Sequence, residues 1–506
     1  MQMKKILSLL LALLLLLTTV TTLLSCADDT QGDTEPPEDN TPEQPDDETP
    51  GEEEKPEKLL PNLPDIAFGG EEFHCLHWTL DSGVGGGWVP WEEIAVAEPT
   101  GDLLVDQVYQ RNAYVEEKYD VTVTTEYCMA HTEMAPKIRN AVATDDKSFQ
   151  MMVQRSANLT GMWTEELFHD LGGDEMHHID LTRPWWNQDS VNVFTLGGNT
   201  QFASSEMLLL DKSETGCVFF SSVLQADHSL DNFYDLVNEG TWTWEALLSN
   251  ASVCVDDLNG DDTMDANDLW GSAGNRAPGA YLYCGSGYSF AELDEDGYMI
   301  SNFGDEESIS LMVELHENMI YADSHAHSDY IKDFSIKKKF ESNEVLFIYY
   351  SVKMSNNLRD METNYGILPI PKYDEYQEDY HCLIMPDGDS VIGVPLSCGN
   401  TEMVSLVIEA LSAESYYTVY PAFYDVVLMS KFTRDTQSKD MLKIVFDSRT
   451  YDLGAIYGLG GFYGQLVTHA ATKRDSNIAS LYASMESTLN SSLQTINDLI
   501  DKWSES

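Results

Sequence analysis

Strand-like and helix-like segments alternate in the first third of the folded region, and this order restricts the fold more than any other feature. Residues 72–78 and 120–124 are rich in aromatic or β-branched side chains, and residues 149–153 form a short apolar run, as expected for strands. Residues 102–118 and 133–143 lie between them and have a helical pattern. A β-α-β-α-β order predicts a parallel, right-handed, doubly wound sheet, so the fold class is α/β.

The same style continues to the end of the chain. Further strands are expected at residues 217–220, 345–350 and 364–368, and further helices at residues 244–251, 306–320 and 403–411. In residues 478–503, apolar side chains recur at three- and four-residue intervals. This stripe fits a terminal helix that docks onto its own domain or a coiled coil with a partner, and docking is the favoured interpretation.

The first 26 residues form a secretory signal. Lys4 and Lys5 precede an apolar run from Ile6 to Val20, which is too short for a comfortable membrane span. The run is followed by Leu-Leu-Ser-Cys ending at Cys26, which resembles the bacterial lipobox. The resemblance implies that Cys26 is lipidated and anchors the protein at the extracellular face of the cell membrane. A plain signal peptide with an accidental cysteine is the alternative.

Residues 27–62 have the composition of a disordered tether. They are rich in Asp, Glu, Pro, Thr and Gly and contain no apolar run that would offset the entropy of ordering. About 440 residues remain beyond the tether, which is enough for two lobes or two domains.

Charge and cysteine content exclude several classes of protein. The formal net charge is -58, from 86 acidic and 28 basic residues. A nucleic-acid partner is therefore excluded, because phosphate binding needs a basic surface, whereas neutral solutes and cations remain possible ligands. Seven scattered cysteines follow Cys26 without a CxxC pair, and this odd number predicts free, buried thiols rather than a disulfide framework.

Six short segments, taken in order, resemble bacterial extracellular solute-binding proteins, a group that includes the carbohydrate binders of ABC importers. The resemblance covers nearly the whole globular part. The segments are Gly70–Phe73, Val108–Val121, Gly240–Trp244, Tyr365–Pro371, Ile408–Ser412 and Pro421–Asp425.

This resemblance implies a type II periplasmic-binding-protein clamshell, with two doubly wound lobes joined by a hinge. We expect lobe 1 at residues 63–195 with a return segment at about 389–418, and lobe 2 at residues 196–388 with a C-terminal segment at about 419–506. Ligand would bind between the lobes of a monomer and stabilise the closed form that ABC permease subunits recognise.

Candidate ligand-binding residues follow from the rule that ligands bind at the carboxyl ends of the strands of such sheets. Sugars suit aromatic platforms together with Arg, Asp and Glu side chains. The candidates are Trp78, Asp81, Arg155, Trp186, Glu214, Tyr350 and Tyr424. Core packing is the alternative role for each aromatic residue, and an interlobe salt bridge is the alternative for Arg155.

Residues 257–268 form a calcium-like loop in the expected second lobe. Oxygen-bearing side chains occupy loop positions 1, 3, 5, 9 and 12, as a Ca2+ loop requires. They are Asp257, Asn259, Asp261, Asp265 and Asp268. The loop resembles the dockerin variety but has Asp262 at position 6, where Gly normally eases the turn. A structural Ca2+ ion is expected, and an acidic surface turn that binds nothing specific is the alternative.

The expected function is delivery of a solute, with an oligosaccharide preferred over a peptide or polyamine, to an ABC importer. A surface glycoside hydrolase and a glycan-binding adhesin are the alternatives, although no GxSxG, HExxH, Walker or GxGxxG motif supports an enzyme. The pairs His177–His178 and His325/His327 lack a third ligand at zinc spacing and are predicted to be solvated loop residues.

Overall fold

The computed structural model describes residues 59–78, 92–128, 132–159, 161–275, 277–428, 436–466 and 476–505. Residues 59–506 form one unit by their contacts. Cys26 and Asp81 lie outside the described residues, so their predicted roles stay predictions.

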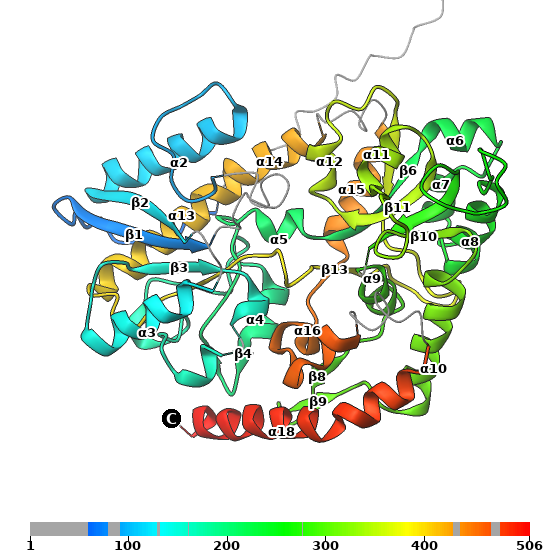
Figure 1. The fold of residues 1–506 in the computed structure, drawn as a ribbon. Coiled ribbons are helices and arrows are strands. Elements are labelled where there is room, and N and C mark those ends of the chain that lie inside the picture. The colour runs from blue at the N-terminus through cyan, green and yellow to red at the C-terminus, as the bar shows by residue number, and fades with distance from the viewer. Residues whose placement is uncertain are drawn as a thin grey trace, which may run out of the picture. The chain divides into compact units, whose positions relative to one another are not determined.

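The first sheet has four strands in the order β14-β3-β1-β2 (Figure 1). β1 (Glu71–Trp78) pairs in parallel with β2 (Val121–Cys128) and with β3 (Met151–Gln154). β14 (Val391–Gly393) comes from much later in the chain and runs antiparallel to β3. The parallel β-α-β-α-β arrangement expected from the sequence is therefore confirmed, with one antiparallel strand added at its edge.

The helices beside the first sheet begin and end at signals found in the sequence. The carboxylate of Asp102 accepts the backbone N–H groups of Leu104 and Val105 at 3.0 and 3.2 Å, which caps α2 (Leu103–Tyr119). α2 ends at Asp120, whose φ of 48° is left-handed. The helices around this sheet are α2, α3 (Met134–Thr144), α13 (Thr401–Tyr417) and α14 (Val419–Leu428), and α2 packs against α13 and α14.

The second sheet has five strands in the order β10-β7-β11-β6-β12. β6 (Gly216–Ser221) runs antiparallel to both β11 (Val345–Ser351) and β12 (Tyr365–Leu368). β7 (Trp270–Gly274) is parallel to β11 and to β10 (His325–His327). Every residue of β6 and all but Tyr350 of β11 are buried, as expected for strands covered on both faces.

Short helices surround the second sheet. They are α5 (Leu210–Ser213), α6 (Ser222–Asp227), α7 (Phe233–Asn238), α8 (Trp244–Val253), α9 (Pro278–Gly285), α10 (Glu306–Leu315), α11 (Ile336–Glu341), α12 (Met354–Asn357) and α15 (Thr436–Asp447). α10 continues into a π-helical turn, His316–Ile320, so the helix expected over residues 306–320 is confirmed with a change of winding at its end.

Smaller elements complete the described chain. They are the pairs β4 (Thr195–Leu196) with β5 (Asn199–Thr200), β8 (Ala291–Leu293) with β9 (Met299–Ser301) and β13 (Cys382–Leu383) with β15 (Arg449–Thr450), the helices α4 (Gln188–Phe194) and α16 (Leu453–Tyr457), and the 3-10 turns η1 (Ser156–Asn158), η2 (Trp163–Glu165), η3 (Asp174–Met176) and η6 (Leu459–Gly461).

The C-terminal helix α18 (Ile478–Ser504) docks onto the body of its own chain, as predicted. It packs against α10 and β9, and the side chain of Asn497, in its last third, bonds the backbone N–H and C=O of Met299 at 2.8 and 3.0 Å. At its C-terminal end, Lys502 pairs with Glu166 at 2.5 Å, and the Trp503 ring lies 6.1 Å from that of Trp163. Figure 1 shows this helix running from α10 toward the side of the first sheet.

The remaining sequence expectations have mixed outcomes. All seven cysteines after Cys26 are free and buried, as predicted. His325 and His327 are not solvated, which corrects the sequence prediction: they are 5% and 3% exposed in β10, an edge strand of the second sheet, because β7 and the π-helical turn His316–Ile320 pack against it. Burial, together with the neighbouring His327, lowers the pKa of His325 to about 3, so this ring is neutral.

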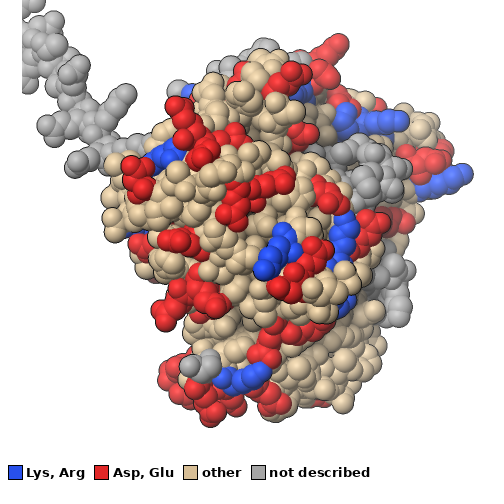
Figure 2. Space-filling view, turned by 90° about the vertical axis from the view of Figure 1, so that its left-hand side faces the viewer, with Lys and Arg blue, Asp and Glu red and all other residues tan. Residues whose placement is uncertain are grey.

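The charge on the surface and the packing of the later helices complete the description of the fold. Figure 2 shows one face of the molecule, on which Asp and Glu side chains form many small groups and Lys and Arg are fewer. None of the helices within the described ranges is long and apolar enough to cross a membrane. α14 packs on α2 and α13 beside the first sheet, whereas α15 packs on α7 and β12. The lobe boundaries expected from the sequence stay a prediction.

Candidate functional site

Residues 385–390, here called the connecting segment, link the ends of the two sheets. The segment follows β13 and leads into β14. On the side of the second sheet, the N–H of Met385 donates to the backbone oxygen of Glu214, just before β6, at 3.1 Å. On the side of the first sheet, Pro386 accepts the N–H of Ala157 at 3.0 Å, just after β3. Groups at the ends of both sheets therefore meet at one short piece of chain.

Trp78 and Arg155 lie against the connecting segment from the first sheet. Trp78 ends β1, is fully buried and donates its indole N–H to the hydroxyl of Ser390 at 3.2 Å. The guanidinium of Arg155 lies 5.9 Å from the Trp78 ring centroid, and its Nη1 donates to the backbone oxygen of Asp387 at 3.1 Å. Burial lowers the pKa of Arg155, and the nearby Asp387 and Asp389 oppose that shift. The Nε of Arg155 is buried and has no hydrogen-bond partner among the described residues.

Asp389 is the buried acid of the connecting segment. Its side chain has no solvent exposure, and Oδ1 accepts the N–H of Ser156 at 2.8 Å. Burial raises the pKa of Asp389 well above its usual value, and the nearby Asp211 and Glu214 raise it further. Burial therefore favours the protonated form of this carboxyl group, whereas its hydrogen bonds from Ser156 favour the charged form.

Glu214 faces the connecting segment from the second sheet. It is 3% exposed, accepts the hydroxyl of Ser351 at 3.1 Å and forms an ion pair with Lys353. A Cβ atom at Gly388 would clash with the Glu214 carboxyl carbon. Glycine is needed at position 388 because the Glu214 carboxylate lies directly against the backbone there.

Tyrosine side chains lie near Glu214 or against the connecting segment. Tyr350, near the end of β11, is partly exposed, and burial raises its pKa, with a further contribution from Glu214. Tyr281 of α9 is buried, and burial raises its pKa well above the usual value, with smaller contributions from Glu214 and Tyr350. The Tyr463 hydroxyl donates to the Met385 sulfur at 3.5 Å. Aromatic rings and hydroxyls therefore accompany the carboxylate on this side.

A buried cluster of charges lies where the chain passes from the first sheet to β6. Lys212 of α5 is 3.1 Å from a carboxylate oxygen of Asp211 and 3.1 Å from one of Glu206. Arg449 of β15 lies 3.8 Å from Asp211. Two acids and two bases compensate one another here, which is the condition under which buried charges are tolerated.

The sequence-predicted residues fall into two groups. Trp78, Arg155 and Glu214 meet at the connecting segment, with Tyr350 beside Glu214. Trp186 lies elsewhere, is 1% exposed and donates its indole N–H to Glu409 at 2.9 Å. Tyr424 is also elsewhere, and its hydroxyl donates to the backbone oxygen of Lys439, on α15, at 3.4 Å. Ligand contact stays a prediction for all of them.

Sequence reasoning missed Ser351, Lys353, Gly388 and Asp389. A signal was present for two of them: the run Pro-Asp-Gly-Asp at 386–389 has turn chemistry and comes directly before an apolar strand. For Ser351 and Lys353 the signal was weaker, although Lys353 is a rare basic residue just after a strand of an acidic chain.

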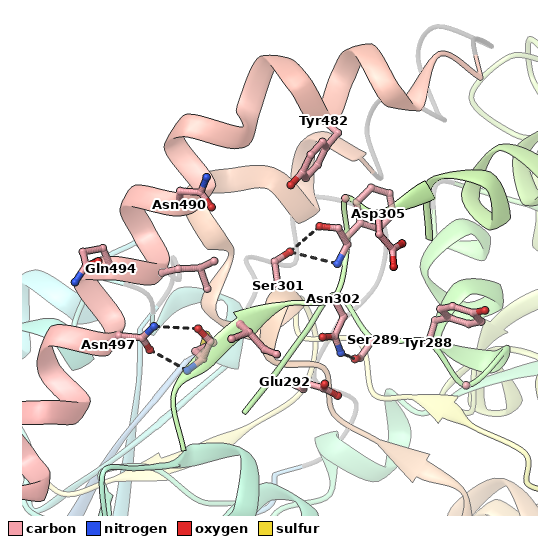
Figure 3. A pocket seen from close by; sticks show the side chains of 16 residues that line it. Tyr288, Ser289, Glu292, Ser301, Asn302, Asp305, Tyr482, Asn490, Gln494 and Asn497 are labelled. Atoms are coloured by element: carbon pink, nitrogen blue, oxygen red, sulfur yellow. Dashed lines mark hydrogen bonds between the residues drawn. The ribbon is translucent and has the colours of Figure 1, made fainter. Parts of the chain in front are cut away.

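A separate polar pocket of about 840 Å³ lies between α18 and residues 287–305 (Figure 3). Several of its side chains bond to one another or to its walls: the Asn302 amide donates to the Ser289 hydroxyl at 2.7 Å, and Gln494 donates to Asp498 at 2.6 Å. The ring of Tyr482 lies where a Cβ of Gly304 would be. Amides and hydroxyls of this kind suit a neutral, hydroxyl-rich molecule, but most of them already form hydrogen bonds within the protein.

The calcium-like loop is organised around its own backbone. Asp257 accepts the N–H of Gly260 at 2.8 Å and that of Asp262 at 2.7 Å. Asp268 is fully buried and accepts the N–H of Leu258 at 3.0 Å and that of Asp265 at 2.6 Å. Asp262 has a φ of 63°, the left-handed conformation in which loop position 6 normally requires Gly.

The loop fits calcium by the type of its donors. Its carboxylate and amide oxygens are the hard ligands that Ca2+ prefers. Its carboxylates do not, however, form a group of three with oxygens within 4.8 Å of one another; over the described ranges that spacing is met by His177, His178 and Glu402. Calcium binding by the loop stays a prediction.

Comparison with known proteins identifies the fold. No protein-family model matches the chain, and no curated protein matches its sequence. UspC of M. tuberculosis has a TM-score of 0.53 and 14% identity, with 83% of this chain and 100% of that chain covered. A cyclo/maltodextrin-binding protein complexed with maltotetraose has a TM-score of 0.52 and 12% identity, with 85% and 98% covered.

An ABC substrate-binding protein, Lmo0181 from Listeria monocytogenes in complex with cycloalternan, has a TM-score of 0.51 and 11% identity, with 85% and 99% covered. The similarity extends over nearly the full length of each of these proteins. At such low identity it shows the fold, and the expected α/β fold of the type II periplasmic binding proteins is confirmed.

Proposed function

We propose that this chain, which has the type II periplasmic-binding-protein fold, captures an oligosaccharide outside the cell and delivers it to an ABC importer. The observation that carries the proposal is the similarity of fold over 85% of this chain to an ABC substrate-binding protein solved with cycloalternan and to a cyclo/maltodextrin-binding protein solved with maltotetraose. The acidic composition favours a neutral solute, since a net charge of -58 repels anions at long range.

The oligosaccharide would bind at the connecting segment. Trp78 and Arg155 would supply an aromatic edge and a hydrogen-bonding cation from the first sheet, and Glu214 and Tyr350 a carboxylate and a ring from the second. A ligand that contacts residues of both sheets stabilises the conformation in which the two sheets are closest. Binding therefore shifts the population toward a closed form. The unpaired Nε of Arg155 supports this assignment, because a buried donor without a partner is costly unless a ligand completes it.

Three further features belong to the same proposal. Cys26 would carry a lipid that anchors the protein at the outer face of the membrane, and residues 27–62 would hold the folded part away from it. The loop 257–268 would bind a structural Ca2+ ion. The protein would act as a monomer without catalysis, in contact with the permease subunits only in its closed form.

Thermal unfolding of the purified protein with and without Ca2+, against maltotetraose, cyclic glucans, a peptide and a polyamine, tests the proposal. A ligand that binds only the folded state raises the stability by about 2.7 kcal/mol at one hundred times its Kd, which is a readily measured shift in Tm. Arg155→Ala is expected to abolish the shift. Arg139→Ala is the matched control, because this arginine is exposed and pairs with Glu165 away from the site.

Scattering measurements separate the alternatives. A transport receptor is expected to lower its radius of gyration when ligand is added, because the lobes close. An adhesin would bind glycan without that change, and a glycoside hydrolase would release new reducing ends. No shift in Tm with any glycan, or release of reducing ends by wild type that Glu214→Gln abolishes, would overturn the proposal.

A further inference from the structure

His177, His178 and Glu402 form a cluster of metal-binding side chains away from the connecting segment. The histidines directly follow η3, and Glu402 lies in the first turn of α13, more than two hundred residues later in the chain. One ligand atom from each side chain lies within 4.8 Å of the other two. The sequence could not reveal this group, because the third member is distant along the chain.

The donor set is that of zinc. Two imidazole nitrogens and one carboxylate oxygen leave the fourth position of a tetrahedral ion open for water. Bonds of about 2.0–2.2 Å place the ligand atoms of a tetrahedral Zn2+ ion about 3.3–3.5 Å apart. His177 and Glu402 are exposed and His178 is half-buried, so small rotations of free side chains are enough to close the gap from 4.8 Å.

The histidine rings are already arranged side by side. Their centroids are 4.1 Å apart and their planes differ by 47°. The Nε2 atom of His178 is buried and has no hydrogen-bond partner among the described residues. A buried ring nitrogen without a partner is unfavourable, and coordination to an ion removes that cost.

A pocket next to the cluster has room for a water molecule as the fourth ligand of the ion. A pocket of about 470 Å³ is lined by both histidines, Asp180, Arg183 and Glu409. Glu409 lies two helical turns after Glu402, so the two acids are on the same side of α13. Water therefore has access to the open coordination position.

We propose that His177, His178 and Glu402 bind one divalent transition-metal ion of the zinc type. The ion joins the turn after η3 to the beginning of α13, two segments that pack together beside the first sheet. It is independent of the calcium-like loop, whose oxygen ligands prefer a harder ion. Because the ion ties two distant parts of the chain together, its binding is expected to stabilise the fold.

Equilibrium dialysis of the purified protein against Zn2+, with Ca2+ present in excess to occupy oxygen-rich sites, measures the binding. Wild type is expected to retain one equivalent of zinc. His178→Gln and Glu402→Gln are each expected to weaken that binding by at least about 100-fold, since loss of even an outer-shell partner costs 10- to 100-fold. Co2+ in place of zinc is expected to give the visible absorption of a tetrahedral site in wild type only.

Two exposed residues provide matched controls. His228→Gln and Glu239→Gln make the same chemical changes on another part of the surface and are expected to keep the zinc equivalent. Circular dichroism checks that all four variants are folded, which is expected since the substituted side chains are at most half-buried. Equal zinc binding by wild type and by the double variant His178→Gln/Glu402→Gln, or no binding by wild type, would overturn the inference.

Discussion

Raising the pH from 5 to 8 is expected to weaken the folded state through Glu409. This α13 carboxylate is 2% exposed, and its two oxygens accept the indole N–H groups of Trp185 and Trp186, each at 2.9 Å. Burial raises the pKa of Glu409 from 4.5 to about 7, although the indole hydrogen bonds oppose the shift. In the folded protein the acid therefore keeps its proton to a higher pH than in the unfolded chain.

The size and the sign of the effect follow from proton linkage. Below about pH 4.5 the acid is protonated in both states and costs nothing. Between about pH 4.5 and 7 the unfolded chain releases its proton first, so the free energy of unfolding falls as pH rises. Above about pH 7 the whole penalty is present, and it amounts to about 3 kcal/mol, because each tenfold difference in proton affinity between the two states is worth about 1.4 kcal/mol.

Urea unfolding at pH 5, 6, 7 and 8 and constant ionic strength measures this penalty when wild type is compared with Glu409→Gln. Glutamine removes the titration, but its amide must turn an N–H toward one of the indoles, at a pH-independent cost of about 1–3 kcal/mol. The stability of wild type relative to Glu409→Gln is therefore expected to fall by about 2–3 kcal/mol from pH 5 to pH 8, so that the variant becomes the more stable protein at the higher pH.

Trp186→Phe provides a second test of the same cause. It removes a hydrogen bond that lowers the pKa of Glu409, so the falling part of the stability curve should extend to higher pH. The reasoning is refuted if the difference between wild type and Glu409→Gln stays constant from pH 5 to pH 8.

Three further substitutions test other parts of the structure. Lys353→Met leaves Glu214 buried without its counter-ion and should lower the free energy of unfolding, measured in urea, by about 3–5 kcal/mol. The additional substitution Glu214→Gln should recover much of this loss. A loss below about 1 kcal/mol would contradict the pairing. Asp262→Gly should stabilise the protein by about 1 kcal/mol, because the left-handed φ of 63° no longer strains a side chain, and calorimetry should show tighter Ca2+ binding; weaker binding would show that this carboxylate is itself a ligand. Lys502→Glu breaks an exposed pair with Glu166 and should lower the free energy of unfolding by less than about 1 kcal/mol. Amide hydrogen exchange should become faster only at the C-terminal end of α18, and faster exchange throughout α18 would refute this.

The fold was largely predictable because its elements carry local signals. The capping aspartate at 102 marks the start of α2, and the β-branched run after Asp120 marks β2. The long apolar stripe of α18 was recognisable for the same reason. What local signals could not provide was the placement of β14, which returns from position 391 to pair with β3. Such long-range pairing depends on the packing of the whole domain and leaves no short-range pattern.

The candidate site was predictable only in part. The rule that ligands bind at the carboxyl ends of strands led to Trp78 and Arg155, because both directly follow or end strands of the parallel sheet. The rule could not foresee that Asp387, on a segment more than two hundred residues away, would accept a hydrogen bond from Arg155. Nor could it distinguish Trp186, whose indole N–H donates to the buried Glu409, from a tryptophan at the connecting segment.

The scarcity of basic residues offers a better guide than any motif in this chain. With 28 basic against 86 acidic residues, solvation and repulsion keep most carboxylates at the surface, and a cation placed inside has a specific partner there. Arg155, Lys212, Lys353 and Arg449 bear this out, since each is buried or half-buried beside a junction between the two sheets. In a strongly acidic protein, basic residues next to strand ends should therefore be examined first as structural junctions or ligand contacts.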